Sequence, residues 1–145
     1  MTIDRRAVRD VACAFFALVV ALLLYRGWRQ GMWIHAPHTV IDAPLLAFAR
    51  AHPLPSFVRF SMPDALWQYA FGATMLAMWR GERWHWRKIA FALAPVVLGA
   101  GIEIGQAFGL VQGVFDPLDL VASVLAGAFA IAIHGDVRVR VTARA

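Results

Sequence analysis

The chain has 145 residues, of which 61% are hydrophobic and only 16% are charged, and its formal net charge is +5. A soluble domain of this size is roughly half apolar and about a quarter charged. The composition therefore excludes an ordinary soluble domain and predicts an integral membrane protein. The single cysteine excludes an intrachain disulfide and a cysteine-based metal cluster. We expect one transmembrane domain over residues 1–145, without a separate soluble module.

Four apolar segments predict an all-α protein with transmembrane helices at about 8–25, 63–79, 89–109 and 117–134. At about 1.5 Å per residue, these lengths approach or match a hydrocarbon core of about 30 Å. Basic residues precede the first segment, as they do in a signal peptide. However, Arg26 follows it directly, with no small-residue cleavage pattern, so we expect an uncleaved anchor helix.

Lysine and arginine are divided unevenly between the two sides of this arrangement. If both termini are cytoplasmic, that side carries Arg5, Arg6, Arg9, Arg80, Arg83, Arg87, Lys88, Arg138, Arg140 and Arg144, and the outer side carries Arg26, Arg29, Arg50 and Arg59. The positive-inside rule therefore predicts that both termini face the cytoplasm. Basic residues of this kind face anionic lipid, so the net charge indicates no nucleic-acid partner.

The long link between the first two spans contains two further apolar patches. Asp42-Ala-Pro44 is typical of a helix start and predicts a short helix as far as Ala51. Two prolines follow, and a second short piece is expected over 57–60. Neither piece is long enough to span, so we expect an interfacial or re-entrant helical hairpin on the outer face. Arg50 and Arg59 would lie at headgroup level, either as a phosphate-facing pair or on a loop that covers the bundle.

Polar residues concentrate near the outer ends of the predicted spans. In the four-span topology, one level of the outer leaflet receives Asp64, Gln68, Glu103, Gln106, Asp116 and Asp119. A charged group at membrane depth costs roughly 2.5–3.5 kcal/mol on insertion scales, so such residues usually face a bundle interior or a polar site. The inner half of the bundle carries almost no acid in this arrangement, and His134 is expected to be solvated at the inner edge.

Several of these residues also have a local structural explanation. Ser61-Met-Pro63-Asp64 resembles a capping box, and Asp116-Pro117 resembles an N-cap followed by a first-turn proline, with Asp119 at the third position. The two glutamines could simply form hydrogen bonds between helices. Glu103 lies well inside its predicted helix, so it cannot cap a helix end. It is therefore the strongest functional candidate, although its carboxyl could instead serve only to form a hydrogen bond with a neighbouring helix.

Small residues recur at a spacing that allows helices to approach closely. Gly101, Gly105 and Gly109 are four residues apart, and Ser123 and Gly127 repeat this spacing in the last span. The first series could serve a homo-oligomer, but contact with another span of the same chain is favoured. The sequence contains no Gly-rich phosphate loop, no nucleophile elbow and no paired-histidine metal motif, so no cofactor or metal is expected.

The order of polar residues over about 63–130 resembles the VanZ-like family of small bacterial membrane proteins. The resemblance is carried by Asp64 at the start of a span, the Glu103-x-x-Gln106 pair, and Asp119 followed by Ser123 and small residues. It implies a bacterial cytoplasmic-membrane protein of the cell envelope. The family's namesake is associated with low-level resistance to the glycopeptide teicoplanin, and no defined reaction follows from this association.

The chain departs from the family pattern at three positions. Gln68 stands where the family tends to have histidine, Gln112 or Gly113 stands where arginine is common, and Ser123 replaces the usual asparagine. These positions therefore do not supply the family's histidine or arginine. Arg59 or Arg50 could supply the positive charge from the outer hairpin.

These observations favour a protein that binds an amphiphile at the outer leaflet, such as a lipid, a polyprenyl-phosphate intermediate or a lipoglycopeptide. Glu103 and Gln106 would form the floor of the niche, and Asp64 and Asp119 would flank it. One alternative is a structural or assembly subunit of a membrane complex. Another is an intramembrane hydrolase or transferase that uses Glu103 and Asp119 as a paired acid and base, although no nucleophile or metal set supports an enzyme.

Overall fold

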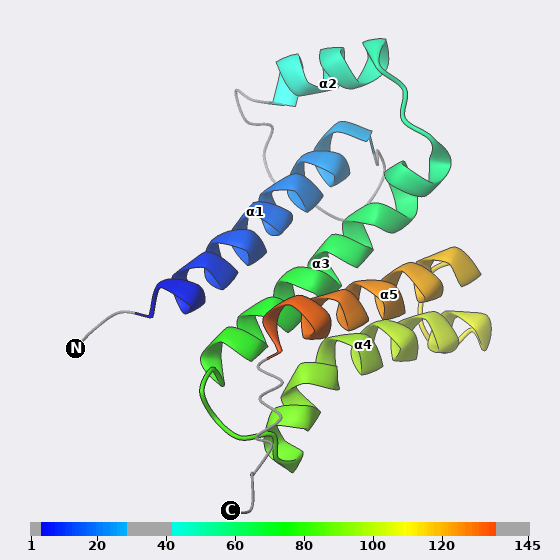
Figure 1. The fold of residues 1–145 in the computed structure, drawn as a ribbon. Coiled ribbons are helices and arrows are strands. Elements are labelled where there is room, and N and C mark those ends of the chain that lie inside the picture. Colours follow the sequence, from blue (N-terminus) through cyan, green and yellow to red (C-terminus); the bar gives the residue numbers. More distant parts are fainter. Residues whose placement is uncertain (1–3, 29–41, 136–145) are drawn as a thin grey trace, which may run out of the picture.

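The computed structural model describes residues 4–28 and 42–135, and the regular structure within these ranges is entirely helical (Figure 1). The described elements, in chain order, are α1 (Arg5–Trp28), α2 (Asp42–Ala51), α3 (Ser56–Met78), α4 (Trp86–Ala107) and α5 (Pro117–His134). The basic residues Arg29, Arg138, Arg140 and Arg144, which contributed to the predicted orientation, lie outside the described ranges.

Helix α3 is the centre of the bundle. It contacts α1, α4 and α5, while α4 also contacts α5, and α2 contacts α1. Figure 1 shows α2 lying across the end of α1, near the start of α3. Helix α4 also ends, and α5 begins, toward this end of the bundle. We call this the α2 end. The opposite end, where α1 and α4 begin and α3 and α5 end, we call the N-terminal end.

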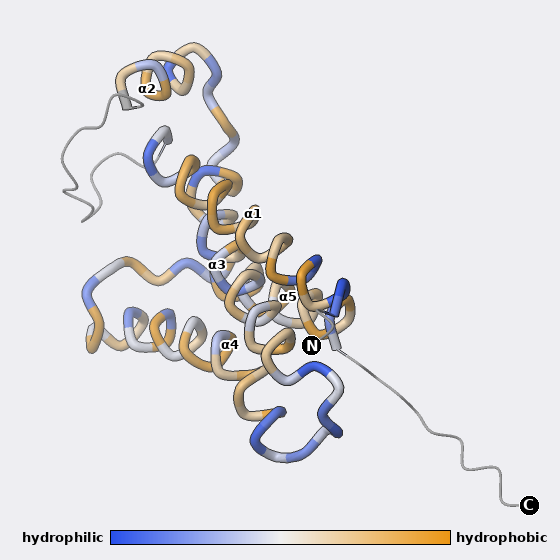
Figure 2. The backbone as a smooth tube through the Cα atoms, turned by 90° about the vertical axis from the view of Figure 1, so that its left-hand side faces the viewer, coloured by the Kyte–Doolittle hydropathy of each residue, from blue (hydrophilic) through white to orange (hydrophobic). Residues whose placement is uncertain are grey.

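Three of the described helices are long and apolar enough to cross a membrane, namely α1, α4 and α5. Figure 2 shows hydrophobic residues along these helices and hydrophilic residues near the helix ends and connections. The all-helical membrane character predicted from composition agrees with this pattern. The central helix α3 is not among the three, so the predicted count of four spans is not established by length and hydropathy.

The predicted hairpin before the second span is wrong in its second half. The first half is correct, since α2 covers 42–51, but residues 56–62 are the first turns of α3 rather than a separate piece. Pro63 lies inside α3 and is buried, so Ser61 to Asp64 is not a capping box. A proline inside a helix removes one hydrogen bond. Packing of the buried residues around Pro63 offsets this loss, because tertiary contacts supply most helical stability.

The other helix bounds lie close to the predictions. Helix α5 has the predicted range of 117–134, and α1 extends the predicted 8–25 at both ends. Helix α4 ends at Ala107, because Gly109 has a φ of +68° and belongs to a turn. The predicted glycine series therefore does not form one helix face: Gly105 packs against Val111 of that turn, and Gly101 faces open space.

The interior is built from small residues, and most large apolar side chains point outward. The central cluster contains Ala14, Ala17, Ala70 and Ala73, with Leu18, Leu66 and Tyr69 packed against it. Exposed positions include Phe15, Phe16, Val97, Leu98 and Leu125. This arrangement suits a bilayer, where small residues allow helices to approach and lipid solvates the large apolar side chains.

Two glycines provide a matched test of this close packing. A Cβ atom added at Gly127 on α5 would lie 2.1 Å from Cγ2 of Val96 on α4, whereas one added at Gly101 would meet nothing within 4 Å. We expect Gly127→Ala to lower the free energy of unfolding by about 1–3 kcal/mol, because valine cannot easily rotate away. Gly101→Ala should leave it unchanged or raise it by about 0.5–1 kcal/mol.

Thermal unfolding of the two variants in detergent, beside the wild type, measures this difference. Equal unfolding temperatures for both variants would show that α4 and α5 do not approach closely at Gly127.

Candidate functional site

Four carboxyl groups come together at the α2 end of the bundle. Asp64 lies on α3, Glu103 on α4, and Asp116 and Asp119 at the start of α5. All three aspartates are close enough to Glu103 for their charges to interact with it. Asp119 is only 7% exposed, while the other three are partly exposed. Side chains far apart in the sequence therefore form one acidic cluster, which we define as Asp64, Glu103, Asp116 and Asp119.

A tight connection between α4 and α5 positions two members of this cluster. Gly109 and Gly113 have φ values of +68° and +144°, which a side-chain-bearing residue rarely adopts. They let the chain reverse direction within a short loop. Asp116 then caps α5, because its Oδ1 accepts a hydrogen bond from the N–H of Leu118 at 2.8 Å. Its own N–H donates to Oε2 of Glu103 at 3.3 Å, which links the end of α4 to the start of α5.

Asp64 connects the acidic cluster to the first helix. The hydroxyl of Tyr25, in the last turns of α1, donates a hydrogen bond to Oδ1 of Asp64. Asp64 lies eight residues after the first residue of α3, so it does not cap that helix, contrary to the expectation. All four large helices therefore contribute a polar side chain to the α2 end.

The remaining predicted amide and hydroxyl residues lie beside this cluster. The amide of Gln68 lies directly against Gly99, where α3 and α4 meet, and the amide of Gln106 lies against Gly113 of the turn. Ser123 is buried one turn further along α5 than Asp119. The glutamines thus occupy contacts between segments of the chain, and the hydrogen bonds that they are expected to form between helices stay a prediction.

The two predicted arginines share a separate hollow at the same end. It has a volume of about 390 Å³ and is lined by Gly27, Trp28, Ala49, Arg50, Pro53, Leu54, Arg59 and Phe60. Nε of Arg50 donates to the carbonyl of Leu46 at 3.3 Å, and the guanidinium of Arg59 lies 4.4 Å from the centre of the Phe60 ring. Both arginine side chains are exposed. The hollow can therefore offer two cations to an anionic group.

Contacts between α1 and α2 hold this hollow in place. Nε1 of Trp28 donates to the carbonyl of His52 at 2.9 Å, and the Trp28 ring meets Phe48 edge-on. Gly27 is buried against Leu45 and Ala49 of α2. The short helix is thus attached to the last turn of α1.

A second polar cluster, at the N-terminal end, was missed by the sequence analysis. Asp10 on α1 is 0% exposed and forms an ion pair with Arg80, which follows α3. Its Oδ1 lies 3.0 Å from Nδ1 of His134 at the end of α5, and 3.3 Å from Nη2 of Arg9. Nε2 of His134 in turn lies 2.8 Å from the hydroxyl of Tyr69. We call Asp10, Arg80, His134 and Tyr69 the buried polar chain.

This cluster corrects two expectations. The N-terminal half of the bundle does contain a buried acid, and His134 is 3% exposed rather than solvated. One sequence signal could have revealed Asp10. It shares a helix face with Ala14, Ala17 and Ala21, at intervals of four, three and four residues. An acid at the end of such a small-residue face is placed for burial against the neighbouring helix.

Neither cluster has the arrangement of a metal centre. Among the residues that the structure describes, no group of three or more His, Cys, Asp or Glu side chains could hold a metal ion. Comparisons of the chain with protein-family models, with curated protein sequences and with solved structures give no match. The geometry of the two ends of the bundle is therefore the basis for assigning a function.

The buried polar chain predicts a large loss of stability when its acid is neutralised. We expect Asp10→Asn to lower the free energy of unfolding by about 3 kcal/mol, because it removes the buried negative charge that pairs with the guanidinium of Arg80. Glu82→Gln, which removes the same charge from an exposed position, is the matched control. Unfolding in detergent, followed by circular dichroism, measures both variants. An equal effect of the two substitutions would contradict a structural role for the Asp10 contacts.

Proposed function

We propose that this chain is a VanZ-like protein of the bacterial cytoplasmic membrane, with α3 as a fourth span and both termini in the cytoplasm. Helix α3 has 23 residues, or about 35 Å at the usual rise, which is enough to cross a hydrocarbon core of about 30 Å. Its contacts with α1, α4 and α5 support this role, because a helix surrounded by others needs less apolar surface. Basic residues at the N-terminal end support its cytoplasmic placement.

We further propose that the protein binds an amphiphile at the outer leaflet through the α2 end. The observation that carries this proposal is the convergence of Glu103, Asp64 and Asp119 from three helices. Carboxyl groups near membrane depth are costly, and they are usually retained where they serve a polar site. Such a cluster is suited to accept hydrogen bonds from the hydroxyl, amide or amine groups of a headgroup.

The arginine hollow provides positive charge for a phosphate-bearing ligand, which the acidic cluster alone would repel. Carboxylates repel phosphate, but Arg50 and Arg59 line a hollow of their own beside α2. A ligand could place its phosphate on the arginines, where charge-assisted hydrogen bonds are strong, and its hydroxyl or amine groups near Glu103. A lipid, a polyprenyl-phosphate intermediate and a lipoglycopeptide such as teicoplanin each combine an apolar chain with a polar head of this kind. The separation of a cationic hollow from the acidic cluster is the basis on which we propose a role in glycopeptide resistance.

One observation favours a second candidate function, a structural subunit of a membrane complex. Glu103 accepts a hydrogen bond from the N–H of Asp116, so its carboxyl could serve only to join α4 to α5. In that case a glutamine, which keeps an acceptor oxygen, would replace it without loss.

Native mass spectrometry of protein released in gentle detergent tests the binding function. We expect a lipid or polyprenyl adduct on the wild type that is reduced at least tenfold on Glu103→Gln, the effect of losing a charge-assisted hydrogen bond of about 1.5–3 kcal/mol. Glu82→Gln is the control, since it removes an exposed acid at the opposite end. An adduct of equal intensity on Glu103→Gln would contradict the proposal.

The absence of any adduct, together with equal unfolding temperatures for wild type and Glu103→Gln, would favour the structural subunit. In a structural subunit, Glu103→Leu should destabilise the fold where Glu103→Gln does not, because leucine cannot accept the hydrogen bond from Asp116.

A further inference from the structure

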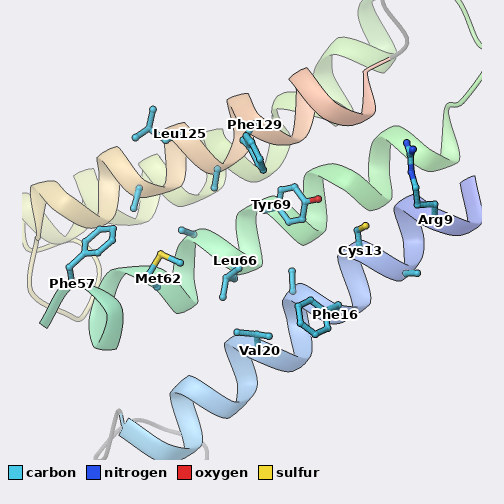
Figure 3. Close-up of a pocket in the computed structure, with 15 residues that line it drawn as sticks. Arg9, Cys13, Phe16, Val20, Phe57, Met62, Leu66, Tyr69, Leu125 and Phe129 are labelled. Carbon is cyan, nitrogen blue, oxygen red and sulfur yellow. The ribbon is translucent and has the colours of Figure 1, made fainter. Parts of the chain in front are cut away.

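An apolar groove runs along the bundle between α1 and α5, over α3 (Figure 3). Its volume is about 910 Å³. Figure 3 shows Phe16 and Val20 on one side, Leu125 and Phe129 on the other, and Leu66 between them. Alanines of all three helices also line it, and their small side chains leave the space open. The groove is distinct from the polar clusters at the ends of the bundle, although Tyr69, a member of the buried polar chain, also lines the groove.

The groove extends over most of the length of the bundle. Its lining runs from Arg9 at the N-terminal end to Phe57, the second residue of α3, at the α2 end. The acyl chain of a lipid in one leaflet covers half of a hydrocarbon core of about 30 Å, or about 15 Å. Such a chain, with its headgroup at Arg9, would occupy the half of the groove that lies nearest the N-terminal end.

The groove is charged at one end only. Arg9 lies at the N-terminal end, near the hydroxyl of Tyr69 (Figure 3). Its side chain is 61% exposed even though it contacts Asp10 at 3.3 Å. Asp10 also pairs with Arg80, so one carboxylate is shared by two guanidinium groups. Arg9 thus gives the mouth of the groove a positive charge, which is complementary to an anionic headgroup.

We propose that this groove binds an anionic phospholipid of the leaflet at the N-terminal end, with an acyl chain between α1 and α5 and the phosphate at Arg9. That leaflet is the cytoplasmic one in the topology proposed above, and anionic lipids attract basic residues there. This site is separate from the acidic cluster, and it does not depend on the proposed outer-leaflet ligand.

The headgroup contact is tested with delipidated protein in detergent, to which phosphatidylglycerol or phosphatidylcholine of the same acyl length is added. Native mass spectrometry then measures the lipid retained. We expect the wild type to retain phosphatidylglycerol preferentially, and Arg9→Gln to retain about fivefold less, the effect of one arginine near the surface. Arg5→Gln removes an exposed arginine outside the groove and should retain the wild-type amount.

The acyl-chain contact is tested without a destabilising substitution. Cys13 is the only cysteine of the chain and is exposed in the groove. Pyrene maleimide attached to Cys13 of the folded protein should fill the groove and prevent retention of phosphatidylglycerol. Cys13→Ala protein treated with the same reagent should still retain it.

Three results would overturn the proposal. The first is equal retention of phosphatidylglycerol by wild type and Arg9→Gln. The second is equal loss on Arg5→Gln and Arg9→Gln, which would indicate general attraction to basic residues. The third is retention of the lipid after Cys13 is blocked. A dimer that dissociates when Cys13 is blocked would instead assign the groove to a second copy of the chain.

Discussion

The burial of Asp10 is the constraint on which the arrangement of the helices depends. A carboxylate removed from water is tolerated only when it is paired and hydrogen-bonded. Asp10 forms an ion pair with Arg80 after α3 and lies against His134 at the end of α5, and its Oδ1 accepts hydrogen bonds from Arg9. Three helices must therefore meet at the N-terminal end for the charge to be compensated. The contact between Asp10 and His134 also places the ring of His134 against Tyr69, so the fixed arrangement of side chains extends to the middle of α3.

The polar groups of the bundle are divided between its two ends, and the length between them is nearly apolar. At the α2 end, three aspartates gather around Glu103, and two arginines share a hollow nearby. At the N-terminal end, a single buried acid is surrounded by cations. The two ends therefore present different chemistry. The α2 end offers hydrogen-bond acceptors and a separate pair of cations, whereas the N-terminal end offers the positively charged mouth of the groove. An amphiphile at each end would meet a distinct recognition surface.

The sequence predicted the helices from composition and the acidic cluster from spacing, because both depend on local patterns. In an arrangement of four antiparallel spans, Glu103 near the end of the third and Asp119 near the start of the fourth must lie at the same end. The hairpin before α3 was wrong because a buried proline was read by its local tendency to end a helix, and packing around Pro63 overrides that tendency. The glycine series was wrong because Gly109 serves the turn and not the helix. The Asp10 contacts were missed because they join residues about 70 and 124 positions apart, which no short motif records.

The alanine interior has a consequence for how α1 is held along its axis. Alanine side chains have no rotamers to lose on packing, but they also provide no large projections that interlock with α3. The face formed by Ala14, Ala17 and Ala21 could therefore slide along its neighbour at little cost in packing. Two polar contacts prevent this: Asp10 with Arg80 near one end of α1, and Tyr25 with Asp64 near the other. They lie about 22 Å apart along the helix, so a shift of one turn would break both at once. The polar contacts at the two ends of α1 thus fix its axial register. The apolar face between them only keeps α1 packed against α3.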